Sequence, residues 1–197
     1  MTRFDFWFEF ASTYSYPAAH RIEVVARAAG LALAWRPFLL GPIFAAQGWN
    51  DSPFNIYPAK GRYMWHDLGR VCAELDLPLR RPSVFPRSGL LAARVACRFA
   101  GEAWLPEFVR RVYRANFAED RDIASPEVLA AILASLGQPP ERLDEARAPA
   151  AKDLLRRQTE EAVGLGIFGA PTFVVDGELF WGGDRLDAAV ARATRAA

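Results

Sequence analysis

The sequence predicts an α/β fold in which a small sheet is split by a long helical insertion. Two segments near the start alternate as strands do and enclose a helix, two more strand segments lie near the end, and roughly a hundred residues between them have helical periodicity. We therefore expect residues 1–42 and 160–197 to form an α/β domain, and residues 43–159 to form an inserted all-helical domain.

The first segment, residues 3–10, has the two-residue period of a strand. Its phenylalanines should face one side of the sheet, and the residues between them should face the other: Phe4, Phe6, Phe8 and Phe10 against Arg3, Asp5, Trp7 and Glu9. Residues 31–38 alternate in the same way. The chain between them opens with serines and a proline and closes at Gly30, which are helix start and stop signals. This βαβ order predicts two parallel strands.

The middle of the chain changes character. Residues 42–58 are rich in Pro, Gly and Asn, which predicts an irregular segment with neither helix nor strand. Apolar residues then recur at helical spacing, and Ser125-Pro126 and Gly137 mark the start and end of one helix. Three stripes carry this pattern: Met64, Leu68, Val71, Cys72 and Leu75; Leu90, Leu91, Val95 and Phe99; and Leu105, Phe108, Val109, Val112 and Tyr113.

The last part returns to strands. Residues 172–175 and 178–181 flank Asp176-Gly177, the signature of a two-residue hairpin with a type I′ turn. A short amphipathic helix follows, for which Asp184 is the expected N-cap.

Composition narrows the function classes. Lys and Arg total 24 against 23 Asp and Glu, so no charge excess favours nucleic acid or an anionic membrane. No apolar run suits a membrane span or a signal peptide, and we expect a cytoplasmic protein. The two cysteines, Cys72 and Cys97, form no C-x-x-C pair and are expected to be buried and reduced. Two histidines without ligand-spaced partners predict no metal site.

Ser12 and Ala170-Pro171 are the first candidate site residues. Ser12 lies between a hydrophobic strand and a helix, where free N–H groups favour a thiolate or another anion, although Ser12 or Ser15 acting only as a helix cap explains the position equally. Pro171 begins a strand. If the bond before it is cis, the Ala170 backbone offers an edge to a peptide ligand, but the general preference is for trans.

Three polar residues complete the candidate set. Asp184 follows Gly182 and Gly183, and either caps a helix or binds an ammonium group that the glycines allow to approach. Asn55 and Lys60, in and just after the irregular segment, suit an amide and a carboxylate, although exposed lysine is common.

Four separated strings, in this order, resemble one family. They are FWFEFASTYSYPAAHR (6–21), PFNIYPAKGRYMWHDLGR (53–70), PSVFPRSGLLAARVA (82–96) and IFGAPTFVVDGELFWGGDRLD (167–187). The sequence resembles the 2-hydroxychromene-2-carboxylate isomerases, relatives of the kappa-class glutathione transferases within the DsbA-like thioredoxin group. The resemblance spans nearly the whole chain, and its last string is the most specific.

The resemblance implies a thioredoxin fold with an inserted all-helical domain, glutathione as cofactor, a small aromatic substrate and a homodimer. It places the glutathione sulfur beside Ser12 and the tripeptide backbone on Ala170, before a cis Pro171. It places the γ-glutamyl end on Gly182, Gly183 and Asp184, and further contacts on Asn55 and Lys60. The family usually has proline where this chain has Thr13 and often aspartate where it has Glu9.

Four functions remain open at this stage. The leading hypothesis is a glutathione-dependent isomerase of an aromatic-derived 2-oxo acid, in which the thiolate is a transient nucleophile. A kappa-like transferase would consume glutathione instead. A disulfide oxidoreductase is disfavoured because dithiol exchange needs a second thiol within reach. A non-catalytic binding module would not activate the thiol.

Overall fold

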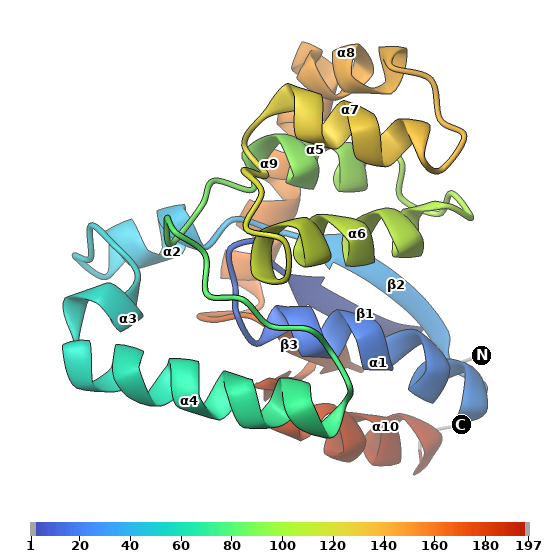
Figure 1. Cartoon of the computed structure of the whole chain (residues 1–197). Coiled ribbons are helices and arrows are strands. Elements are labelled where there is room, and N and C mark those ends of the chain that lie inside the picture. Colours follow the sequence, from blue (N-terminus) through green and yellow to red (C-terminus); the bar gives the residue numbers. More distant parts are fainter. Residues whose placement is uncertain (1–2, 196–197) are drawn as a thin grey trace.

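The computed structural model describes residues 3–195 and contains the predicted βαβ unit. Strand β1 (Arg3–Phe8), helix α1 (Ser15–Ala28) and strand β2 (Ala32–Pro37) follow one another, and the two strands pair in parallel. Strands β3 (Thr172–Val175) and β4 (Glu178–Trp181) complete a sheet of order β2-β1-β3-β4, in which β3 is antiparallel to both of its neighbours (Figure 1). The four predicted strands are confirmed.

The turn between β3 and β4 is also as predicted. Asp176 and Gly177 have φ angles of 50° and 81°. Positive φ at both central residues defines the type I′ turn, whose twist matches that of the flanking strands.

The chain between β2 and β3 is helical. Its helices are α2 (Leu40–Ala46), α3 (Pro53–Ile56), α4 (Pro58–Glu74), α5 (Leu90–Arg98), α6 (Leu105–Phe117), α7 (Pro126–Ala134), α8 (Glu141–Arg147) and α9 (Pro149–Gly164). In Figure 1, α5, α7 and α8 lie above the sheet, whereas α4 runs beside α1. Helix α9 continues unbroken through residues 159 and 160, where we expected the domain boundary, and contacts both α5 and β2.

Two expectations were wrong. Residues 42–58 are not irregular, since they contain most of α2 and all of α3. Ser52 Oγ accepts a hydrogen bond from the Phe54 N–H and Pro53 opens α3, so local capping supports a helix too short for apolar periodicity to reveal. Asp184 is not an N-cap: it lies inside a 3₁₀ turn, η1 (Gly183–Arg185), that precedes α10 (Leu186–Arg195).

Both faces of β1 are covered. The phenylalanines at alternate positions, Phe4 to Phe10, are fully buried in the large core with α1, α5 and α6. Trp7 points to the opposite face, where it packs with Phe38 and Val174 in a second, smaller core. The predicted alternation is therefore confirmed. Because both faces of β1 are packed, the end of the strand is held in place, and so is the start of the loop that leads to α1.

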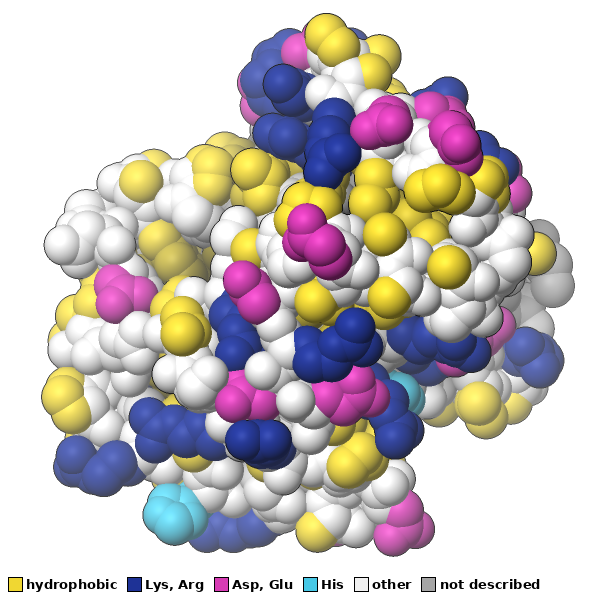
Figure 2. Space-filling view, turned by 45° about the horizontal axis from the view of Figure 1, so that its top comes forward, with side chains coloured by type: hydrophobic (Ala, Val, Ile, Leu, Met, Phe, Trp, Pro, Cys, Tyr) yellow, Lys and Arg dark blue, Asp and Glu magenta, His cyan; other side chains and the backbone are white. Residues whose placement is uncertain are grey.

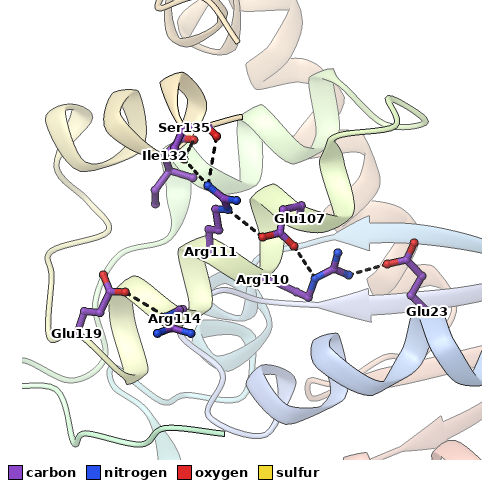
Figure 3. A network of polar contacts seen from close by, with 8 residues as sticks. All are labelled: Glu23, Glu107, Arg110, Arg111, Arg114, Glu119, Ile132 and Ser135. Carbon is purple, nitrogen blue, oxygen red and sulfur yellow. Dashed lines mark hydrogen bonds and ion pairs between the residues drawn. The ribbon is translucent and has the colours of Figure 1, made fainter. Parts of the chain in front are cut away.

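Helix α6 holds that loop and is itself anchored by charged side chains. The Tyr113 hydroxyl donates to the Glu9 carbonyl (2.9 Å) at the end of β1. On the outer side, Arg110 pairs with Glu23 of α1 at 2.6 Å, while Arg111 donates to the hydroxyl of Ser135, just after α7, at 2.7 Å (Figure 3). Single exposed pairs of this kind contribute little. As a connected network they tie α6 to the elements on either side.

The face of the molecule in Figure 2 shows no charge bias of the kind that marks a nucleic-acid interface. Lys and Arg side chains are interspersed with Asp and Glu on the face shown in Figure 2. Among residues 3–195, no helix is long and apolar enough to cross a membrane.

Glu9 is a buried acid just beyond β1. Its carboxylate accepts a hydrogen bond from the Ala11 N–H (2.8 Å), and no basic side chain of residues 3–195 lies within ion-pair distance of it. Burial raises the pKa of this carboxyl to about 7, partly opposed by backbone hydrogen bonds. The protonated form of Glu9 is therefore favoured by folding.

This burial predicts how stability depends on pH. Between the ordinary pKa of a glutamate and about 7, the folded protein holds a proton that the unfolded chain releases, so the free energy of unfolding falls as pH rises. In the Glu9→Gln variant, the free energy of unfolding should fall by about 2–3 kcal/mol less over this pH range than in the wild type, because an amide keeps the Ala11 contact and does not ionise. Urea unfolding of both proteins at pH 5 and pH 8 measures the difference.

His20 titrates in the opposite sense, because burial lowers its pKa to about 4. The wild type and the Glu9→Gln variant share this contribution, so the difference between their pH profiles reports Glu9 alone. Parallel profiles would mean that Glu9 is not a buried, raised-pKa acid.

Candidate active site

A serine hydroxyl and a peptide carbonyl, 158 residues apart in the chain, meet beyond the end of β1. Ser12 Oγ donates to the Ala170 carbonyl oxygen at 2.8 Å and accepts from the Ser15 N–H at 3.3 Å. The first contact faces the segment before β3, and the second caps the first turn of α1. Ser12 therefore combines the capping role with a position at the junction of two distant segments, so neither interpretation made from the sequence excludes the other.

The Ala170–Pro171 peptide bond is cis, as the resemblance implied. Ala170 is half-buried, and its N–H has no hydrogen-bond partner among residues 3–195. The carbonyl of Pro171 accepts from the Gly182 N–H at 2.9 Å, which fixes the segment after β4 beside it. An unpaired backbone donor thus lies next to the Ser12 hydroxyl.

The segment after β4 lies against the same loop. Gly182 has a φ of 109°, a backbone conformation that favours glycine, and a Cβ there would also push the Asp184 carboxylate aside. A Cβ at Gly183 would lie 3.7 Å from the Tyr14 carbonyl oxygen. The Asp184 carboxylate is exposed, and its one ion pair in the described chain is with the adjacent Arg185, at 3.4 Å.

Asn55 and Lys60 have no direct contact with this cluster. The Asn55 side-chain amide donates to the Asp51 carboxylate and to the Phe85 carbonyl, both at 3.1 Å. The exposed Lys60 ammonium lies 4.8 Å from the centre of the Tyr57 ring. The structure therefore brings together Ser12, Ala170, Pro171, Gly182, Gly183 and Asp184, and leaves Asn55 and Lys60 on a separate helical segment.

Tyr14 connects the two groups, and sequence reasoning missed it. Its hydroxyl donates to Asp67 of α4 at 2.9 Å, and its ring meets the edge of Phe54 of α3 at 6.4 Å between centroids. Burial and the Asp67 contact raise the pKa of the Tyr14 phenol, so it stays neutral at physiological pH. The contact joins residues 53 positions apart, and no local spacing pattern signals it.

Two further hydroxyls surround the loop. The side chains of Thr13 and Ser15 are buried, and their oxygens have no hydrogen-bond partner within residues 3–195. Buried polar groups of this kind usually find a partner in water or a ligand. Together with Ser12 they make the start of α1 polar, next to the apolar end of β1.

The chain's own thiols are unsuited to chemistry here. Cys72 and Cys97 are both unpaired, and burial raises the pKa of each thiol to about 11. The described residues contain no cluster of His, Cys, Asp and Glu that would hold a metal ion. A thiolate at this site must therefore come from a bound molecule.

The arrangement suits an anion more than a covalent serine nucleophile. The start of α1 places a partial positive charge beside the loop, while its Ser15 and Tyr16 N–H groups already donate to Ser12 Oγ and to the Thr13 carbonyl. No histidine or carboxylate of residues 3–195 hydrogen-bonds to Ser12, so no general base activates its oxygen. What remains is a hydroxyl donor beside an unpaired peptide N–H.

Comparisons with known proteins agree with this architecture. Residues 3–192 match the family model of the DSBA-like thioredoxin domain. The chain is 32% identical over 186 residues to the 2-hydroxychromene-2-carboxylate isomerase of Sphingobium xenophagum, covering 93% of each protein. It is 29% identical over 170 residues to the human glutathione S-transferase kappa 1, covering 79% of this chain and 74% of that one.

Structural comparison gives the same result. A solved structure of a 2-hydroxychromene-2-carboxylate isomerase superimposes with a TM-score of 0.86 at 25% identity, covering 98% of this chain and 97% of the other. The expected thioredoxin fold with its helical insertion is confirmed. The chain belongs to the DSBA-like thioredoxin-domain family, in which its sequence groups with the 2-hydroxychromene-2-carboxylate isomerases.

Proposed function

We propose that this enzyme is a glutathione-dependent isomerase of the 2-hydroxychromene-2-carboxylate type, in which Ser12 stabilises the bound thiolate. The observation that carries the proposal is the position of the Ser12 hydroxyl, which lies at the start of α1 and 2.8 Å from the Ala170 carbonyl. The names of the relatives support the reaction class. The proposal includes a cytoplasmic homodimer, as the resemblance implies.

The backbone around Ala170 fits a peptide ligand. Its N–H has no partner in the described chain, and its carbonyl has a second lone pair beyond the one that Ser12 uses. A tripeptide lying along this segment would form hydrogen bonds of the kind that link β-strands, with Pro171 beneath it. Gly182 and Gly183 leave room above η1, and the exposed Asp184 carboxylate is free to pair with an α-ammonium group.

Asn55 and Lys60 have more distant roles in this proposal. They belong to α3 and α4, which contact the Ser12 loop through Tyr14 and Phe54. A ligand held at Ala170 would reach them with its other end, the amide at Asn55 and the carboxylate at Lys60. For Lys60 this requires the side chain to leave the Tyr57 ring.

Glutathione, when bound, would supply a thiolate that adds to an unsaturated carbon of the substrate, permits rotation about the former double bond and then departs unchanged. A free thiol has a pKa near 8.5, and lowering it by about two units requires roughly 2.7 kcal/mol of preference for the anion. One hydroxyl donor and the partial positive charge at a helix start supply an energy of that order.

The Ser12 hydroxyl must reorient to play this role. It has a single proton, which in this structure is donated to Ala170. A bound thiolate, as a charged acceptor, would compete with the neutral Ala170 carbonyl for this proton. Rotation about the Cβ–Oγ bond would then turn the proton toward the sulfur, while Oγ keeps accepting from the Ser15 N–H.

A kappa-like glutathione transferase is the second candidate, favoured by the similarity to the human kappa enzyme. The two reactions share the site and differ in whether the sulfur leaves. A disulfide oxidoreductase fits less well, because both cysteine thiols have raised pKa values and are unpaired.

The fate of glutathione separates the two candidates. With 2-hydroxychromene-2-carboxylate as substrate and glutathione far below it in concentration, an isomerase should complete many turnovers while the free thiol remains constant. Chromatography of substrate and product, with a thiol assay in parallel, measures both. Stoichiometric loss of thiol with a conjugate as product would instead assign a transferase.

Ser12→Ala tests the role of the hydroxyl. It should reduce turnover at neutral pH by roughly tenfold or more, because one charge-assisted hydrogen bond to the thiolate is lost. Glutathione affinity by calorimetry should change less, since the other proposed tripeptide contacts are unaltered. Full turnover in this variant would leave Ser12 as a helix cap, with backbone N–H groups alone activating the thiol.

Asp184→Ala tests the ammonium contact. Its loss should weaken glutathione binding by about 1–3 kcal/mol, toward the lower end because the carboxylate is exposed. Asp187→Ala is the matched control, since Asp187 is also exposed and pairs with Arg21 on the outer surface. Equal dissociation constants for the two variants would count against the assignment.

A further inference from the structure

An open cavity of about 780 Å³ lies on the helical side of the molecule, beside the Ser12 cluster but not part of it. Its walls come from the segment before α3, from α3 and α4, and from the chain that follows α4. The lining residues are Asp51, Phe54, Asn55, Pro58, Gly61, Arg62, Trp65, His66 and Arg81. The volume is in the range of small-molecule sites. The residues of the Ser12 cluster do not line it.

The cavity carries an excess of positive charge. Most arginines of the described chain pair with a carboxylate, but Arg62 and Arg81 have no ion-pair partner among residues 3–195. The carboxylate in the lining, Asp51, already accepts from the Ser52 N–H and from the Asn55 side chain. Two guanidinium groups without a carboxylate partner in the described chain therefore share one cavity, and arginine is the side chain best shaped to bind a carboxylate.

One wall of the cavity is aromatic. The half-buried Trp65 is held in place by the ring of Phe85 at 5.1 Å, and the Arg81 guanidinium lies 5.3 Å from the Trp65 ring. Phe54 supplies a second ring. An aromatic surface next to two cations without an ion-pair partner within residues 3–195 matches a planar aromatic acid, whose ring packs on the wall while its carboxylate meets the arginines.

We infer that this cavity binds the carboxylate end of a planar aromatic acid, with Arg81 and Arg62 as its carboxylate ligands. The cavity adjoins the reaction site, since the ring of Phe54 also contacts Tyr14, two residues after Ser12. Its assignment to the acid substrate rests on the proposed function, whereas the binding itself does not require glutathione.

Calorimetric titration with 1-naphthoate, in the absence of glutathione, tests the site directly. The wild type should bind 1-naphthoate, and the neutral 1-naphthamide should bind roughly tenfold more weakly or worse. Arg81→Ala and Arg62→Ala should each weaken naphthoate binding by a similar factor. Arg80→Ala and Arg70→Ala are matched controls on the same segments, because both side chains are exposed and pair with Asp120 and Asp67. They should bind as the wild type does.

A second titration repeats the measurement with saturating glutathione, whose own binding is measured separately. We expect naphthoate to bind together with glutathione and its affinity to change by no more than a few-fold, because only Asn55, of the residues proposed for glutathione, lines the cavity. Equal affinity for naphthoate and naphthamide, or equal binding by Arg81→Ala and Arg80→Ala, would overturn the inference, as would competitive displacement by glutathione. If glutathione does not bind while naphthoate binding still depends on the arginines, the proposed function is contradicted and the inference about this cavity stands.

Discussion

The candidate site depends on the antiparallel pairing of β1 with β3. Trp7 lies opposite Thr172, so the chain leaving β1 and the chain entering β3 emerge at the same end of the sheet. This register allows the hydroxyl of Ser12 to reach the carbonyl of Ala170 across 158 residues of sequence. The N-terminus of α1 and the Gly182 segment then pack around that contact, so it places the Ser12 cluster, whereas the positions of Asn55 and Lys60 depend on α3 and α4.

The proposed chemistry requires only a small stabilisation free energy from each group at the site. Ser12 offers one proton and α1 offers a partial charge to the thiolate, while Ala170 offers an unpaired N–H to the peptide backbone of the ligand. Each of the first two contributes on the order of a kilocalorie per mole to an anion. Their sum is comparable with the shift of a thiol pKa toward neutrality, whereas the chain's own cysteines are moved by burial in the opposite direction.

Regular patterns in the sequence predicted the sheet. Alternation in residues 3–10 and the Asp176-Gly177 turn depend on local geometry, and both were confirmed. The cis bond at Pro171 followed from the resemblance alone, since the general preference is trans. Helices α2 and α3 were missed because elements of seven and four residues are too short to give a periodic signal. The separation of Asn55 and Lys60 from Ser12 was beyond prediction, because it depends on how α4 packs against Tyr14.

The most direct test of the account is the ionisation of glutathione in the wild-type protein. Ultraviolet difference spectra, recorded as pH is varied, report the thiolate absorbance of bound against free glutathione. The account predicts a bound thiol that ionises about two units below the value near 8.5 of a free thiol, with substantial thiolate at neutral pH. A bound thiol that titrates like free glutathione, or no binding at all, would contradict it.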